Sequence, residues 1–181
     1  MPNIISKQNT HVVFIDNDDS YIRDLLAKLE EVNEYNIKIY SRSIDFFDDF
    51  KLARFDTYKT YIIFLSTNLG TDEENNDINA LEVLKRIKKM NSQCEVILYS
   101  DNDDINIVSS AFHFGAYTFI KKNDNLILRI ENNILGIISL KNFLLKKEAS
   151  RRFTKIFLLF VAGISIVLIT LYMLFPHLFS I

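Results

Sequence analysis

The chain has 181 residues, a formal net charge of -2 at pH 7 and one cysteine, Cys94. This length accommodates one domain of ordinary size and an appendage. A single cysteine excludes an internal disulfide and is typical of a reducing compartment. A basic segment near residue 150 offsets an acidic remainder, and this balance argues against nucleic acid as a partner.

Short apolar runs that favour β-strands alternate with segments of helical periodicity. The predicted strands are residues 11–15, 37–40, 61–65, 95–99 and 118–120. The run 61–65 is the most apolar of them and indicates a central strand buried on both faces. The residues of 37–40 alternate in polarity, which favours a partly exposed strand.

Helical spacing predicts helices at residues 22–32, 44–52, 80–90, 105–114 and 126–143. In the second of these helices, Ile44, Phe47 and Phe50 are expected to face inward. Gly115 suits the left-handed position that closes the fourth. This alternation predicts an α/β fold, a five-stranded parallel doubly wound sheet of the flavodoxin-like type.

The last predicted helix has apolar residues at 127, 130, 134, 137 and 138. No proline or strong break separates it from residues 140–155, and Gly136 is the one weak point. We therefore expect an extended last helix that continues, as a semi-rigid rod, into the apolar segment that follows.

Residues 156–181 contain no Asp, Glu, Lys or Arg. At about 1.5 Å per residue, a helix over 156–175 is about 30 Å long, which matches the hydrocarbon core of a bilayer. A helix that is apolar all round has no face for solvent. The pattern predicts a transmembrane helix over residues 156–176.

Basic residues crowd the amino-terminal flank of this segment, whereas only His177 follows it. Cytoplasmic flanks carry such an excess, so residues 1–140 are expected to be a cytoplasmic domain, 141–155 a basic linker and 177–181 a short exterior tail. No apolar signal-peptide segment follows Met1, so export of the domain is not expected. The flanking basic residues are Lys146, Lys147, Arg151, Arg152 and Lys155.

Small polar or charged side chains follow four of the predicted strands. Because the carboxyl ends of parallel strands converge on one crevice, these residues are expected to meet in space. The crevice would hold one carboxylate, one amide, two hydroxyls and an ammonium. A metal or phosphoryl site would need another carboxylate, most naturally at position 66, where the chain has serine.

Five segments of the chain resemble, in order and spacing, the receiver domain of bacterial two-component response regulators. The resemblance extends over roughly residues 10–140 and implies the receiver fold. The segments that carry it are residues 12–19, 62–70, 79–87, 96–100 and 114–123.

This resemblance implies a role for each polar position in the crevice. The metal-binding acidic pair corresponds to Asp16 and Asn17, the phosphoacceptor to Ser66, the hydroxyl switch to Ser100, the aromatic switch to Phe119 and the phosphoryl-contacting lysine to Lys122. The phosphoacceptor of the family is a carboxylate that becomes an acyl phosphate, with Mg²⁺ bridging it to the acidic pair.

Two of the three carboxylates that this chemistry needs are replaced. Serine is protonated at neutral pH and Asn17 lacks charge, so loss of the phosphorelay chemistry and of the Mg²⁺ cofactor is expected. Asp16 with Asp18 is the remaining candidate pair for Mg²⁺. Alternatively, Lys122 pairs with Asp16 in an idle ion pair, and Phe119 is a core residue.

The leading hypothesis is a non-enzymatic, membrane-anchored pseudo-receiver of the bacterial inner membrane, acting as an adaptor or structural subunit without phosphorylation. Its expected partner is a membrane protein or complex, or a second copy through the fourth and fifth strands and the last helix. The alternatives are a conditional receiver that responds to Mg²⁺ or phosphoryl ligands, and an accessory helix subunit of a transport, motor or secretion assembly. No glycine-rich phosphate loop, nucleophile elbow or His/Cys cluster supports an enzyme.

Overall fold

In the computed structural model, residues 5–29, 34–52, 59–72, 74–123 and 125–174 are described. They belong to two compact units, one formed by Ile5–Leu140 and the other containing the residues from Lys141 onward. The predicted end of the transmembrane helix at residue 176 and the tail 177–181 lie outside the described residues, as does the end of the predicted helix 22–32.

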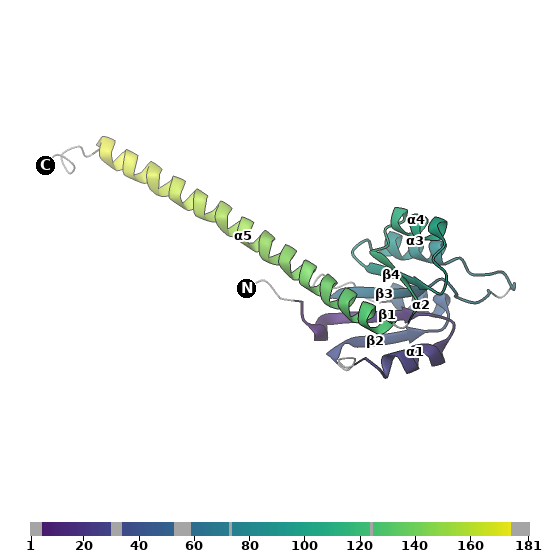
Figure 1. Cartoon of the computed structure of the whole chain (residues 1–181). Helices are drawn as coiled ribbons and strands as arrows, with labels where there is room; N and C mark the ends of the chain where they lie inside the picture. Colours follow the sequence, from purple (N-terminus) through teal and green to yellow (C-terminus); the bar gives the residue numbers. More distant parts are fainter. Residues whose placement is uncertain (1–4, 30–33, 53–58, 73, 124, 175–181) are drawn as a thin grey trace. The chain divides into compact units, whose positions relative to one another are not determined.

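The first unit contains a five-stranded parallel sheet with the strand order β2-β1-β3-β4-β5 (Figure 1). This confirms the predicted fold class. β3 is the central strand and is buried along most of its length, whereas β2 is an edge strand with an exposed face. The strands are β1 (Thr10–Ile15), β2 (Asn36–Tyr40), β3 (Thr60–Ser66), β4 (Glu95–Ser100) and β5 (Thr118–Lys121).

Helices connect the strands, and a short 3-10 helix, η1 (Lys7–Asn9), precedes β1. The α-helices are α1 (Asp19–Leu26), α2 (Ser43–Leu52), α3 (Ala80–Met90), α4 (Ile105–His113) and α5 (Leu126–Leu174).

The expected extension of α1 beyond Leu26 is wrong. The amides of Lys28 and Leu29 donate to carbonyls three residues earlier, so the chain tightens into a turn. Leu29 still packs against the apolar cluster, which explains why its spacing resembled that of a helix.

The two faces of the sheet carry separate apolar cores. α2, α3 and α4 cover one face, where Val13, Ile63 and Leu98 point. α1 and the first part of α5 cover the other face, where Phe14, Phe64 and Tyr99 point. Since successive strand residues point to opposite faces, continuous apolar strands such as β3 supply both cores.

Two of the three α2 residues that were expected to face inward, Phe47 and Phe50, are buried, but the third is not. Ile44 is 48% exposed, and Phe46 is buried in its place. The Phe46 ring contacts the rings of Tyr40 and Phe50, with centroids 5.5 Å and 4.7 Å away. This aromatic cluster favours the orientation of α2 that buries Phe46, Phe47 and Phe50, because aromatic side chains bury the most apolar area.

α5 buries Ile130, Ile134 and Ile137 against the sheet, as its apolar spacing predicted. Leu126 is buried as well, and the predicted positions 127 and 138 are partly buried. The helix is continuous from Leu126 to Leu174, so Gly136 does not interrupt it. Its part in the second unit is long and apolar enough to cross a membrane, judged by length and composition.

Candidate functional site

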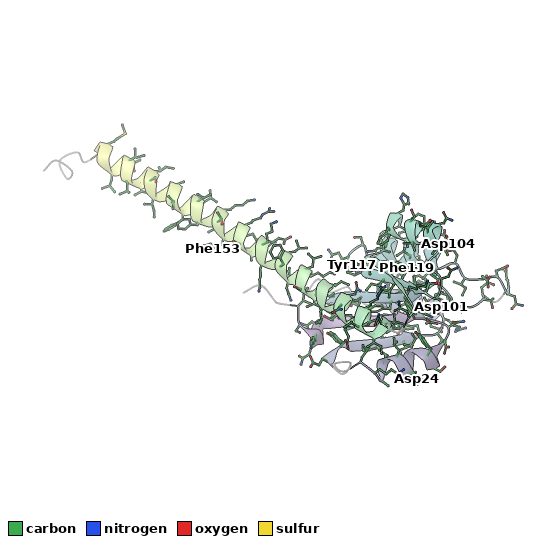
Figure 2. All side chains as sticks on the ribbon, in the orientation of Figure 1. Asp24, Asp101, Asp104, Tyr117, Phe119 and Phe153 are labelled. Carbon is green, nitrogen blue, oxygen red and sulfur yellow. The ribbon has the colours of Figure 1, made fainter. Side chains whose placement is uncertain are left out.

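The carboxyl ends of β1, β3, β4 and β5 gather the polar residues that the sequence singled out. In the sheet register Ser66 is paired with Tyr99, and Ser100 with Lys121. Asp16 directly follows β1, and its amide donates to the carbonyl of Tyr40 on β2. The polar residues therefore meet at this end of the sheet, where Asp101, which follows β4, also lies (Figure 2).

Asp16 is the buried anion of the site, with 1% of its surface exposed. Its Oδ2 accepts hydrogen bonds from the Tyr99 hydroxyl at 2.7 Å and the Lys122 ammonium at 3.2 Å. Its Oδ1 accepts one from the amide of Asp18 at 3.0 Å. Both carboxylate oxygens are therefore already occupied by donors of the chain itself.

Lys122 is the cation that balances this charge, and only 12% of its side chain is exposed. Its ammonium lies 3.2 Å from Asp16 and 3.8 Å from the exposed carboxylate of Asp101. The rings of Tyr21 and Tyr99 lie 4.9 Å and 5.0 Å from it, within cation–π range. The predicted Lys122–Asp16 ion pair is thus confirmed.

Tyr99 is the donor that sequence reasoning missed. Burial and the neighbouring Asp16 charge raise the pKa of its hydroxyl far above the ordinary value, so the group stays protonated and can only donate to the carboxylate. The available signal was a tyrosine in an otherwise aliphatic strand, since a buried tyrosine hydroxyl requires a polar partner. Tyr21 and Asp101 were likewise missed.

Ser66, at the position of the expected phosphoacceptor, is fully buried at the end of β3. Its Oγ accepts a hydrogen bond of 3.1 Å from the amide of Asn68. The Asn68 side-chain oxygen in turn accepts one of 3.4 Å from the side-chain Nδ2 of Asn17. The Ser66 hydroxyl thus stabilises the turn after β3, and the Asn68 side chain links that turn to the residues that follow β1.

The hydroxyl of Ser100 is held from two sides. It accepts hydrogen bonds from Thr67 Oγ1 at 2.6 Å and from the amide of Asn102 at 3.1 Å. The carbonyl of Ser100 also accepts a bond of 2.7 Å from the amide of Lys122. The loops after β3, β4 and β5 are therefore joined by hydrogen bonds through this residue.

Asp18 does not join Asp16 as a ligand pair. Its Oδ1 caps α1 by accepting from the amide of Tyr21 at 2.9 Å and from Ser20 Oγ at 2.7 Å. These bonds, first that of Ser20, lower the pKa of the Asp18 carboxyl. The carboxylate is stabilised in its charged form, but it is engaged by the helix.

The oxygen-bearing side chains of this site do not fit Mg²⁺. The ion needs several oxygen ligands, normally including carboxylates, in octahedral geometry. Here Asp16 is engaged by Tyr99 and Lys122, and the other two positions carry Asn17 and Ser66. Within the described ranges, no group of three or more His, Cys, Asp or Glu side chains could hold a metal ion.

Phe119 on β5 is separate from this polar network. It is half-buried and packs against the core beneath α2, α3 and α4, near the turn that carries Tyr117 (Figure 2). Its neighbour in the sheet register is Leu98 of β4. The partly exposed ring is a core residue at the margin of that face.

Comparison with solved structures identifies the fold as that of a response regulator receiver domain. A response regulator from Thermotoga maritima is 20% identical over 72% of this chain and 98% of its own, with a TM-score of 0.53. A two-component response regulator from Clostridium difficile is 17% identical over 72% and 96%, with a TM-score of 0.57. A CheY-like receiver domain protein from Methanospirillum hungatei is 16% identical over 77% and 98%, with a TM-score of 0.54. No family model and no curated protein matches the chain.

The second unit carries the predicted basic flank as part of α5. All five basic residues are exposed, and Arg152 lies 3.9 Å from Glu148. Beyond Lys155 the helix is free of charged residues, and its hydroxyls bond within the helix, Ser165 to the carbonyl of Val161 and Thr170 to that of Val167. Such internal bonds satisfy the polar groups that hydrocarbon would leave without partners.

Proposed function

We propose that the chain is a membrane-anchored pseudo-receiver that acts without phosphorylation, as a non-enzymatic adaptor or structural subunit of a membrane-associated complex. The observation that carries the proposal is the internal neutralisation of Asp16. Three donors of the chain, from Tyr99, Lys122 and the amide of Asp18, occupy its carboxylate.

Phosphoryl transfer at this site would need a nucleophile that the chain lacks. The acceptor position holds a buried serine whose Oγ already accepts the amide of Asn68. No general base is bonded to that hydroxyl in the described residues, and a serine is a poor nucleophile without one. The receiver fold and this site support a signalling-related module that acts by binding partners through its surface rather than by phosphoryl transfer.

The adaptor proposal is tested by adding Mg²⁺ and beryllofluoride, a phosphoryl mimic, to the full chain in nanodiscs. A ligand that binds the folded state raises its unfolding midpoint. We expect no shift at millimolar Mg²⁺, with or without beryllofluoride. A clear upward shift would instead support the conditional receiver. The variant Asn17→Asp/Ser66→Asp, which restores both carboxylates, serves as the matched comparison.

The proposed anchor is the part of α5 that follows Lys155. Residues 156–174 rise about 28 Å at about 1.5 Å per residue, close to the hydrocarbon thickness of a bilayer. Large apolar side chains such as Ile156, Phe160 and Leu168 are exposed along this segment. An exposed apolar surface of this kind is costly in water and suits lipid or the helices of a partner.

The proposed location is the bacterial inner membrane, with the receiver domain (1–140) on the cytoplasmic side, the linker 141–155 at the surface, one span over 156–176 and the tail 177–181 outside. The excess of Lys and Arg before the span supports this orientation. Protease treatment of intact spheroplasts tests it: the domain should be protected and become digestible only after lysis. Digestion in intact spheroplasts would contradict the orientation.

The proposed partner is a membrane protein or complex. Extraction of the full chain from its native membrane in mild detergent, followed by measurement of mass and composition, distinguishes the assemblies. A stoichiometric membrane partner supports the subunit role. A homodimer would favour pairing through β4, β5 and α5, and a bare monomer would contradict a stable adaptor complex.

A further inference from the structure

We infer that one face of α5 directly before the apolar segment is a binding surface for anionic lipid headgroups. This face, the basic row, consists of Lys147, Arg151 and Lys155. The inference rests on the proposed anchoring of α5 in a membrane and goes beyond it, because it assigns the chemistry of the lipid that the chain selects.

The helical spacing places these three cations together. They are four residues apart along a continuous helix, so their side chains lie on the same face. All three are exposed. At about 1.5 Å per residue, the row is about 12 Å long.

The positive charge of the row is not neutralised by the part of the chain that the structure describes. Arg151 and Lys155 have no ion pair within the described ranges, and Lys147 contacts only the Phe143 ring, 6.0 Å from its ammonium. The one acidic residue between positions 141 and 155 is Glu148, which lies 3.9 Å from Arg152. The nearby hydroxyl of Thr154 is bonded to the carbonyl of Ser150.

The position of the row selects its partner. Lys155 is the last charged residue before the apolar segment, so it would lie at the boundary between hydrocarbon and headgroups. Lys147, about 12 Å further out, lies within reach of the surface potential, since the headgroup region is about 5–7 Å deep and the Debye length is about 8 Å. Outside the chain itself, phosphate groups of anionic lipids are therefore the nearest charges of opposite sign that every copy of the row meets.

The experiment measures lipid preference at the protein perimeter. The full chain is reconstituted in phosphatidylcholine vesicles with spin-labelled phosphatidylglycerol or spin-labelled phosphatidylcholine, and the motionally restricted fraction of each label is compared. We expect phosphatidylglycerol to associate several-fold more strongly, and the preference to weaken as salt is raised. Equal association of the two lipids would overturn the inference.

Matched variants separate the row from total charge. Lys147→Gln/Arg151→Gln/Lys155→Gln should bring the two lipids to near parity, whereas Lys147→Arg/Arg151→Lys/Lys155→Arg should retain the preference. Removing the same charge from exposed lysines of the first unit, in Lys28→Gln/Lys59→Gln/Lys89→Gln, should also leave it intact. A preference that survives neutralisation of the row would overturn the assignment to these residues.

Extraction with alkaline carbonate distinguishes failure of the inference from failure of the proposed anchoring. A chain that stays in the vesicles and shows no lipid preference overturns the inference alone. A chain that carbonate removes overturns both. If the row instead binds an acidic protein subunit, pure lipid vesicles will show no preference, and this result counts against the inference.

Discussion

The hydroxyl of Tyr99 on β4 donates a hydrogen bond of 2.7 Å to the carboxylate of Asp16, which follows β1. The two strands are not neighbours, because β3 lies between them in the sheet. The bond therefore joins β1 and β4 across the central strand. Lys122, which follows β5, donates to the same buried carboxylate.

Tyr99→Phe removes this donor and keeps the ring. Hydrogen bonds to charged groups contribute about 1.5–3 kcal/mol, so we expect the free energy of unfolding to fall by about that amount. Denaturant unfolding of the full chain in detergent, followed by circular dichroism, measures it. Tyr117→Phe is the control. No hydrogen bond of the Tyr117 hydroxyl is found in the described residues, so this variant should change the free energy of unfolding little.

The Asp16–Lys122 pair is expected to show strong coupling in a double-mutant cycle. Lys122→Met leaves a buried charge with fewer partners and should lower the free energy of unfolding by about 3–5 kcal/mol. Asp16→Asn/Lys122→Met removes both charges and should recover much of that loss. Additive effects of the two single variants would contradict the pairing.

Alanine substitutions at two glycines are expected to change the stability of the fold in opposite directions. Gly115 has φ +89°, a left-handed conformation, so Gly115→Ala should destabilise the fold by about 1–2 kcal/mol. Gly136 is helical, and a Cβ there would meet its nearest atom, the Tyr117 hydroxyl, at 3.9 Å. Gly136→Ala should therefore stabilise the fold by about 0.5–1 kcal/mol. Thermal unfolding midpoints of both variants test the signs.

The environment of His11 predicts that the fold loses stability in mild acid. Burial, followed by the charges of Lys59 and Lys38, lowers the pKa of its imidazole below 6.5. The unfolded chain then binds more protons near this pH, so the free energy of unfolding falls as the pH drops from 6.5 toward the lower folded-state pKa. His11→Phe keeps a ring against Tyr61, 5.0 Å away in the native stack, and should reduce this dependence. The free energy of unfolding of both proteins is measured at pH 5.5 and 7.5. If His11→Phe depends on pH as strongly as the native chain, the assignment to His11 is wrong.

Local patterns were sufficient for much of the fold. The β-branched runs located all five strands, and the spacing of Ile130, Ile134 and Ile137 identified the buried face of α5. The same kind of pattern failed for α2, where Ile44 and Phe46 are both apolar residues of one short helix. Contacts of the Phe46 ring with Tyr40 on β2 and with Phe50 in the same helix decided which of them is buried.

The sequence by itself determined the type of fold, the gathering of polar residues at the strand ends and the replacement of carboxylates by Asn17 and Ser66, because these follow from periodicity, parallel topology and residue type. The resemblance also allowed the pairing of Asp16 with Lys122 to be predicted, but only the tertiary structure showed that the Tyr99 hydroxyl donates to the same carboxylate oxygen. The donors to Asp16 come from Tyr99 and Lys122, which are 83 and 106 residues away along the chain. Such partners depend on which side chains the packed sheet brings within hydrogen-bond distance, and no local pattern encodes that distance.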